Sequence, residues 1–146
     1  MDFGMYSDLT KRIIGCAYKV YGVMGFGFLE SVYEKSLAFE LKKEGLWFET
    51  QKAIQVFYQD EIVGNYVADI LVENAVLVEL KSVRNIVKAH EIQLVNYLAA
   101  TKTPVGLLLN FGESNVEVKR KLWKLPRETG RLNHNPVNPV NPVKGF

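Results

Sequence analysis

Cysteine is almost absent from this sequence. Its 146 residues include a single cysteine, Cys16, so the chain can form neither an internal disulfide nor a thiolate metal site by itself. The chain also has no uninterrupted apolar run of about eighteen residues, the length that a membrane-spanning helix needs. Its first residues do not combine a basic segment with an apolar one, as a secretory signal does. These absences predict a reduced, soluble, cytoplasmic protein with no membrane partner.

The residues that are present are those of an ordinary globular domain. Hydrophobic residues make up 48% and charged residues 23%, which excludes a disordered or collagen-like chain, and the length predicts one domain. Charge is unevenly distributed: residues 119–146 carry seven basic and one acidic side chain, whereas residues 1–118 carry 11 basic and 15 acidic ones. Such a basic segment is typical either of a solvated tail or of a surface that attracts polyanions.

Hydrophobic periodicity predicts three helices. Apolar residues at helical spacing predict a helix over residues 8–23, with Ser7 as its N-cap. A second helix is expected to begin at about Leu29 and to end at Gly45, because glycine commonly follows the last turn of a helix. A third helix is expected over residues 89–100.

Five segments have the composition of strands. The expected strands are residues 47–58, 62–72, 75–80, 104–111 and 115–123, the last as an edge strand. Their order predicts an α/β domain over residues 1–126, with a mixed central sheet of about five strands and one crossover helix. Residues 127–146, with their Asn-Pro-Val repeats, are expected to form a flexible, basic extension.

Charged side chains at the end of a buried strand are the first sign of a functional site. Residues 76–81 form an apolar run that ends Glu79-Leu80-Lys81. Because side chains alternate along a strand, Glu79 and Lys81 share a face. Charges are costly in a protein interior unless they are paired or bound to a metal.

The position of Asp69 depends on the turn between its strand and the next. A two-residue loop at Glu73-Asn74 would place Asp69 opposite Val78, and so away from Glu79. A three-residue loop, which adds Ala75, would place Asp69 directly opposite Glu79. Asparagine tolerates the left-handed backbone that such a loop needs, which favours the second register.

Two opposed carboxylates suggest a cation between them. Asp69 and Glu79 would repel each other in the second register unless a positive ion lay between them. Carboxylate oxygens suit Mg²⁺, which would keep open positions for water and phosphate oxygens. Lys81 would then lie one pleat further along, beside a metal-bound water or a charged phosphate. The alternative interpretation is a surface ladder of ion pairs with no function.

Three motifs in the sequence resemble those of one nuclease superfamily. Asp69, followed after nine residues by Glu79-Leu80-Lys81, resembles the signature of the PD-(D/E)XK superfamily, which has the restriction-endonuclease-like fold. The segment from Gly27 to Tyr33 is similar to the motif of the GxxExxY proteins, a bacterial branch of that superfamily. The segment from His90 to Tyr97 resembles the Gln-x-x-x-Tyr element of RecB-type nucleases. The resemblance extends from about residue 13 to residue 125.

This resemblance implies roles for the matched residues. Asp69, Glu79 and the backbone carbonyl of Leu80 would bind Mg²⁺, or Mn²⁺ in its place, and Lys81 would position the attacking water. Glu30, in the first turn of the second helix, would be an additional metal ligand or act through water, and a helix N-terminus favours a carboxylate there.

The remaining motif residues have supporting roles in this interpretation. Gln93 would hold Lys81 or a phosphate, and Tyr97, four residues later on the same helical face, would pack under the site. Gly27 and Tyr33 complete the motif around Glu30. For the two tyrosines and the glycine, a purely structural role in the core or a tight turn is the alternative.

The resemblance predicts an enzyme: a Mg²⁺-dependent nuclease that hydrolyses DNA phosphodiester bonds with a metal-activated water. A domain of this size has little surface for gripping a duplex, so a homodimer or a protein partner is expected to help. The first alternative is a catalytically silent nucleic-acid-binding or partner-docking module on the same fold. The second is a structural α/β protein that binds neither metal nor DNA.

Overall fold

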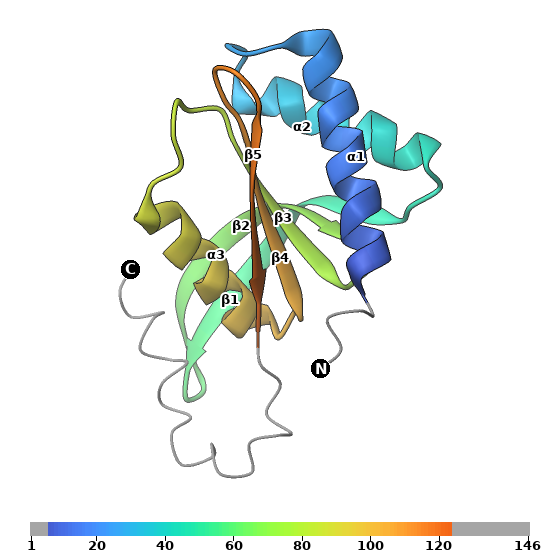
Figure 1. The fold of residues 1–146 in the computed structure, drawn as a ribbon. Coiled ribbons are helices and arrows are strands. Elements are labelled where there is room, and N and C mark those ends of the chain that lie inside the picture. The colour runs from blue at the N-terminus through green and yellow to red at the C-terminus, as the bar shows by residue number, and fades with distance from the viewer. Residues whose placement is uncertain (1–5, 124–146) are drawn as a thin grey trace.

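The computed structural model describes residues 6–123, which form three helices and five strands (Figure 1). In chain order the elements are α1 (Ser7–Met24), α2 (Glu30–Lys43), β1 (Phe48–Tyr58), β2 (Glu61–Val72), β3 (Val76–Lys81), α3 (Lys88–Thr101), β4 (Val105–Phe111) and β5 (Val116–Leu122). All eight expected elements are present. The flexible extension predicted for residues 127–146 lies outside the described residues. No helix within residues 6–123 has both the length and the hydrophobicity needed to cross a membrane.

The five strands form one mixed sheet in the order β1-β2-β3-β4-β5. Neighbouring strands are antiparallel except β3 and β4, which are parallel and are connected through α3. A parallel pair needs a long crossover, whereas antiparallel neighbours need only tight turns. The predicted α/β architecture with one crossover helix is therefore confirmed.

Helix ends follow the sequence at one terminus and depart from it at another. Gly45 lies just beyond α2 with φ of 78°, a backbone conformation that glycine adopts without steric cost, so the predicted helix stop is confirmed. The prediction that Ser7 caps α1 is wrong. The helix already includes Ser7, and the preceding Tyr6 provides no side-chain cap. The Ser7 carbonyl instead accepts a hydrogen bond of 3.0 Å from Thr10 Oγ1.

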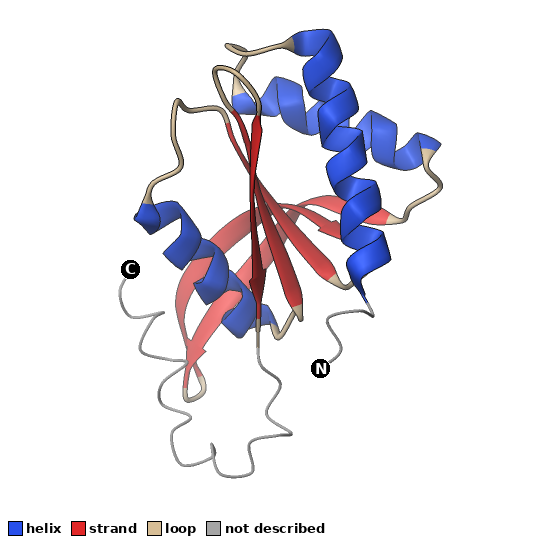
Figure 2. Cartoon of the chain, in the orientation of Figure 1, coloured by secondary structure: helices blue, strands red, loops and turns tan. Residues whose placement is uncertain are grey.

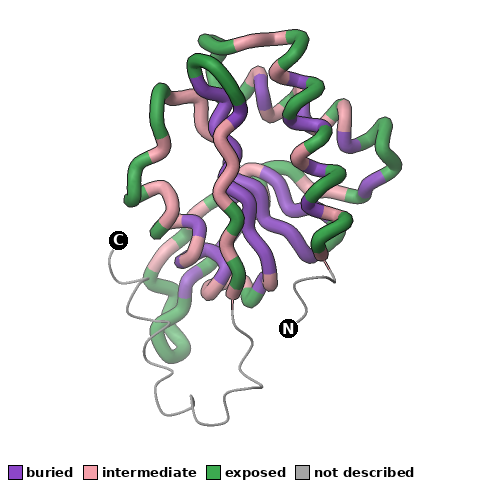
Figure 3. Tube along the Cα trace, in the orientation of Figure 1, coloured by how far each residue is buried: buried purple, intermediate pink, exposed green. Residues whose placement is uncertain are grey.

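The sheet separates two helical layers (Figure 2). Helices α1 and α2 cover one face, where they pack on buried apolar side chains of the central strands, and α3 covers the other face. The two cores meet at the central strands, which are the most buried part of the chain (Figure 3). Residues of the first core include Ile13, Leu37, Ile70, Leu107 and Phe111, and residues of the second include Leu77, Leu94, Leu98 and Leu108.

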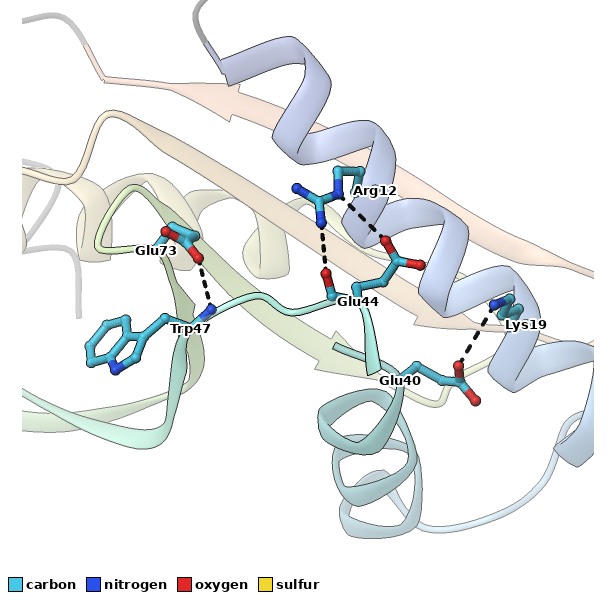
Figure 4. Close-up of polar contacts among 6 residues, drawn as sticks. All are labelled: Arg12, Lys19, Glu40, Glu44, Trp47 and Glu73. Carbon is cyan, nitrogen blue, oxygen red and sulfur yellow. Dashed lines mark hydrogen bonds and ion pairs between the residues drawn. The ribbon is translucent and has the colours of Figure 1, made fainter. Parts of the chain in front are cut away.

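Polar contacts hold the two N-terminal helices together (Figure 4). On α1, Arg12 donates through Nη2 to the main-chain oxygen of Glu44 at 2.8 Å, just after the end of α2. Lys19 lies further along α1, and its Nζ is 3.9 Å from Glu40 Oε1. Both pairs are at the surface, where ion pairs contribute little stability. The buried apolar side chains of α1 and α2 therefore contribute more to holding this layer on the sheet.

The turn between β2 and β3 has the length that the sequence favoured. Val72 pairs with Val76, so the loop contains three residues, and Glu73 and Asn74 have positive φ values of 51° and 55°. The Glu73 carboxylate also accepts the N–H of Trp47 at 2.8 Å (Figure 4). This register places Asp69 across from Glu79, as expected.

Candidate active site

The candidate site lies where β2 and β3 stop pairing. The ladder between these strands ends at the pair Ile70 and Val78. Beyond it, two side chains take the place of main-chain acceptors: the Asp69 N–H donates to Glu79 Oε2 at 2.9 Å, and the Leu80 N–H donates to Asp69 Oδ2 at 2.8 Å. Each carboxylate therefore satisfies a main-chain donor of the opposite strand. In this reciprocal arrangement, main-chain N–H groups alone hold one oxygen of each carboxylate.

Two residues of the predicted signature, Glu79 and Lys81, lie on the face of the sheet that α3 covers, because they alternate with Leu77 of the core beneath α3. Alternation does not assign a face to Asp69, since its neighbours Ala68 and Ile70 belong to the cores on opposite sides of the sheet. Its hydrogen bond with the Leu80 N–H places the Asp69 carboxylate beside Glu79. Among these three, Glu79 is buried, whereas Asp69 and Lys81 are half-buried. The carboxylates thus lie at the boundary between the core and the solvent.

Burial raises the pKa values of both carboxyl groups at the candidate site. Desolvation, followed by the nearby charge of Asp69, raises the pKa of Glu79 to about 8. Desolvation and the charge of Glu30 also raise the pKa of Asp69, against the opposing effects of the Leu80 N–H, the Lys81 ammonium and Gln51. Two desolvated acids that disfavour each other's ionisation form a site that a cation would stabilise.

The donor chemistry fits a hard divalent cation. Asp69 and Glu79 supply carboxylate oxygens, which Mg²⁺ and Mn²⁺ prefer. The main-chain carbonyl of Leu80 lies on the same side of β3 as its N–H, which donates to Asp69, because both groups of a strand residue face the same neighbour. Within residues 6–123, no group of three or more His, Cys, Asp or Glu side chains is arranged to hold a metal ion. Water or substrate oxygens would therefore complete the coordination.

Helix α2 brings further acidic side chains toward the site. Glu30, its first residue, is exposed and lies close enough for its charge to affect Asp69, Glu79 and His90. One turn later, Glu34 also lies near Asp69, and the nearby charge, after desolvation, raises the pKa of Glu34. The sequence indicated Glu30 but not Glu34.

The loop before α2 holds Glu30 in place through the other motif residues. Gly27 has φ of 115°, which only glycine adopts readily. The buried Tyr33 hydroxyl donates to the carbonyl of Gly25 and accepts the Phe28 N–H at 3.3 Å, and its ring stacks on Phe111 at 4.4 Å between centroids. These contacts connect Tyr33 to the loop before α2 and to β4.

Helix α3 places a buried tyrosine close to the two carboxylates. Tyr97 is buried and lies near Tyr66, with 5.8 Å between ring centroids. Desolvation and the nearby negative charges of Glu79 and Asp69 raise the pKa of Tyr97 to about 12, so its hydroxyl stays neutral at physiological pH. That Tyr97 packs under the site remains a prediction.

The other two motif residues of this helix, His90 and Gln93, differ in how firmly their side chains are held. His90 accepts the Val87 N–H through Nδ1 at 3.2 Å in the first turn, and burial, then the charge of Lys81, lowers its pKa. Gln93, one turn before Tyr97, is half-buried, and its side chain forms no hydrogen bond within the described part of the chain. Its contact with Lys81 or a phosphate remains a prediction.

Two residues that support the site escaped sequence analysis. Asn110, fully buried on β4 beside Lys81, exchanges two hydrogen bonds with the main chain of Val83, at 2.9 and 2.8 Å, and so fixes the segment that leaves β3. Its signal was an amide at the end of an otherwise apolar strand. Gln51, on β1, donates to Glu34 Oε1 at 2.7 Å and carried no comparable signal.

The fold, with its helices on both faces of a mixed sheet, can be compared with solved structures. The structure is similar to a solved structure titled "Crystal structure of SSO0001", with a TM-score of 0.51 and 17% sequence identity, over 90% of this chain and 67% of that chain. A likeness at this identity concerns the fold alone. A search of curated proteins found no match.

The family follows from the sequence match. Residues 7–121 match the family model of the PD-(D/E)XK nuclease superfamily, and the chain therefore belongs to that superfamily. The expected restriction-endonuclease-like fold is confirmed by this match together with the architecture. Membership of the GxxExxY branch stays a prediction that rests on Gly27, Glu30 and Tyr33.

Proposed function

We propose that this protein is a Mg²⁺-dependent nuclease that hydrolyses DNA phosphodiester bonds. The observation that carries the proposal is the pair of desolvated carboxylates, Asp69 and Glu79, which accept main-chain N–H groups of each other's strands and lie close enough to Lys81 for its charge to act on both. A nuclease superfamily supplies the class of reaction. Catalytic groups with raised pKa values in a partly buried position are typical of functional sites.

Each residue has a chemical task in this proposal. Asp69, Glu79 and the Leu80 carbonyl would hold the ion, which supplies Lewis-acid stabilisation of a phosphate and lowers the pKa of water. The ammonium of Lys81 would orient the attacking water or stabilise negative charge on the phosphate. Glu30 would bind the ion directly or through water, and Gln93 would hold Lys81 or a phosphate oxygen.

Basic side chains on the same face support a polyanionic substrate. Glu79 pairs with Leu108 on β4, which pairs with Lys119 on β5, so Lys119 belongs to the same row of side chains as the carboxylates. Nearby, Lys121 Nζ lies 2.6 Å from Glu91 Oε1 at the start of α3. Lys119 is suited to a DNA phosphate, whereas Lys121 is already paired with Glu91. A second copy or a protein partner would extend the surface.

A cleavage assay tests the proposal. Purified protein should nick or degrade DNA with Mg²⁺ or Mn²⁺, and the change Asp69→Asn or Lys81→Met should lower the rate by a factor of about 10² or more, because each removes a charge from the reacting centre. The matched controls are Asp60→Asn, in the exposed turn between β1 and β2, and Lys42→Met, near the end of α2. Both should retain full activity.

Two outcomes contradict this assignment. Cleavage that survives both Asp69→Asn and Lys81→Met would assign the activity to another site or to a contaminant. DNA binding without Mg²⁺ uptake in calorimetry, and without cleavage, would identify the silent binding module instead.

A further inference from the structure

One residue within a strand has an unusual backbone beside the candidate site. Thr50 pairs with Ile70 and Lys52 with Ala68, so Gln51 of β1 lies opposite Asp69 of β2. Gln51 has φ of 53°, in the left-handed region, where a residue with a side chain is disfavoured by about 1–2 kcal/mol. Such strain persists only where the surroundings impose it, and it is concentrated at functional sites.

The other residues with this conformation have an ordinary explanation. Within residues 6–123, the remaining non-glycine positions with positive φ lie in turns or at the end of a helix, and they are Gln59, Glu73, Asn74 and Lys102. Gln51 alone of this group lies inside a strand. Turn geometry therefore does not account for the conformation of Gln51.

The side chain of Gln51 connects two carboxylates from different elements. Its Nε2 donates to Glu34 Oε1 of α2 at 2.7 Å. Its side chain also lies near enough to Asp69, across the strand pair, to lower the pKa of that acid by hydrogen bonding. A side-chain amide nitrogen carries two N–H groups, enough to donate to both acids at once. Gln51 is thus a neutral donor between acidic groups that would otherwise repel each other across the gap between α2 and the sheet.

We propose that Gln51 is a positioning residue, whose amide bridges Glu34 and Asp69 and holds the Asp69 carboxylate at the candidate metal site. The inference rests on the proposed function. Asp69 has a main-chain donor on one oxygen, from Leu80, and the bridge adds a second restraint from the other neighbouring strand. Groups that orient a metal ligand typically change metal affinity or activity by a factor of about 10–100 when they are removed.

The first test removes the donor and keeps the volume of the side chain. Gln51→Met should lower kcat for DNA cleavage and weaken Mn²⁺ binding, measured by electron paramagnetic resonance, each by about 10- to 100-fold. KM for DNA should change little, because Gln51 acts through Asp69 and not on the substrate. The control is Gln55→Met, at an exposed glutamine further along β1, opposite Asn65.

The second test separates positioning from folding. Gln51→Gly removes the bridge but relieves the strained backbone, so this variant should melt no lower than the wild type while losing kcat and Mn²⁺ affinity as Gln51→Met does. Gln59→Gly provides the control, since Gln59 has φ of 59° in the turn between β1 and β2. It should keep both activity and Mn²⁺ affinity.

The outcomes distinguish this inference from the proposed function. If the wild type cleaves DNA and binds Mn²⁺, and Gln51→Gly equals it in both, Gln51 is only structural and the inference is wrong. If the wild type neither cleaves DNA nor binds Mn²⁺, both proposals fail together. A loss of kcat and Mn²⁺ affinity in Gln51→Gly, with an undiminished melting temperature, supports both.

Discussion

The two faces of the central sheet differ in the side chains that the same strands place on them. Along β3, Val78 and Leu80 point into the core beneath α1 and α2, while Glu79 and Lys81 point to the face that α3 covers. The first face is entirely apolar around β3. The second is apolar near Leu77 but charged where β2 and β3 separate.

This difference shows how one strand can provide both stability and reactivity. The face beneath α1 and α2 is a closed core that fixes the backbone of β3. On the α3 face, the same backbone holds two partly desolvated acids through main-chain hydrogen bonds. Without these bonds, the repulsion between the acids would move them apart. A site built on rigid elements holds its groups more accurately than one built on loops.

The largest expected effect comes from deleting an apolar side chain of the closed face. Leu107→Ala on β4 should lower the free energy of unfolding by about 3–5 kcal/mol, because the surrounding helices and sheet cannot collapse into the cavity. Leu108→Ala, one residue later on the α3 face, should cost less, about 2–3 kcal/mol. Urea unfolding monitored by circular dichroism measures both values.

The reason for the smaller cost of Leu108→Ala is its neighbour. Leu108 pairs with Glu79 across the strands, so water that enters the new space would solvate that carboxylate. Equal costs for the two leucines would contradict the proposed contrast between the two faces. Val67→Ala, at an exposed residue of β2, is the control for loss of an apolar side chain without a cavity.

The second prediction concerns the pH dependence of the metal-free protein. The pKa of Glu79 is raised to about 8 in the folded state, above its ordinary value of 4.5 in an unfolded chain. The folded state therefore binds this proton more tightly, and the stability that the proton contributes is complete below pH 4.5 and is lost as the pH rises toward 8. In EDTA, the melting temperature should fall across this range.

A neutral isostere should weaken this dependence. Glu79→Gln has no proton to lose at this position, so its melting temperature in EDTA should fall less than that of the wild type from pH 5 to about 8 and exceed it at the upper end. Any remaining decline would come from Asp69 and Glu34, whose pKa values are also raised. Glu61→Gln, at the exposed start of β2, should follow the wild type. A decline in Glu79→Gln as steep as that of the wild type would assign the pH dependence to other groups.

The sequence was sufficient for the fold and for the two central acids because both depend on local rules. Alternation along β3 defined the face of Glu79 and Lys81, and the three-residue loop at residues 73–75 defined the register that brings Asp69 to Glu79. Local rules failed at Ser7, where the helix begins one residue earlier than its capping signal indicates, and at Asp69, where β2 departs from strict alternation.

The residues that sequence analysis missed depend on tertiary geometry. Glu34 belongs to the site because α2 lies beside β1. Its spacing of four residues from Glu30 places the two acids on one helical face, but the sequence does not show that this face approaches β1. Gln51 required knowledge of its backbone, since a strand pattern does not show that one residue has a positive φ. Such contacts between distant segments have no periodic signature in a single sequence.

The smallest expected effect tests whether DNA phosphates contact the face of the sheet that α3 covers. Lys119→Ala on β5 should weaken DNA binding modestly, in EDTA to prevent cleavage, and should lower the slope of log affinity against log salt concentration by about 0.9, the value for one phosphate contact on duplex DNA.

Lys11→Ala, on α1 and therefore on the opposite side of the sheet, is the matched control. It removes the same charge from the whole protein, so any effect of net charge alone would appear equally in both variants. A change in slope only for Lys119→Ala would mean that DNA contacts the α3 face, because a counterion is released only where a phosphate meets a cation. Identical salt-dependence slopes for the two variants would instead show that DNA does not contact the row of side chains from Glu79 to Lys119.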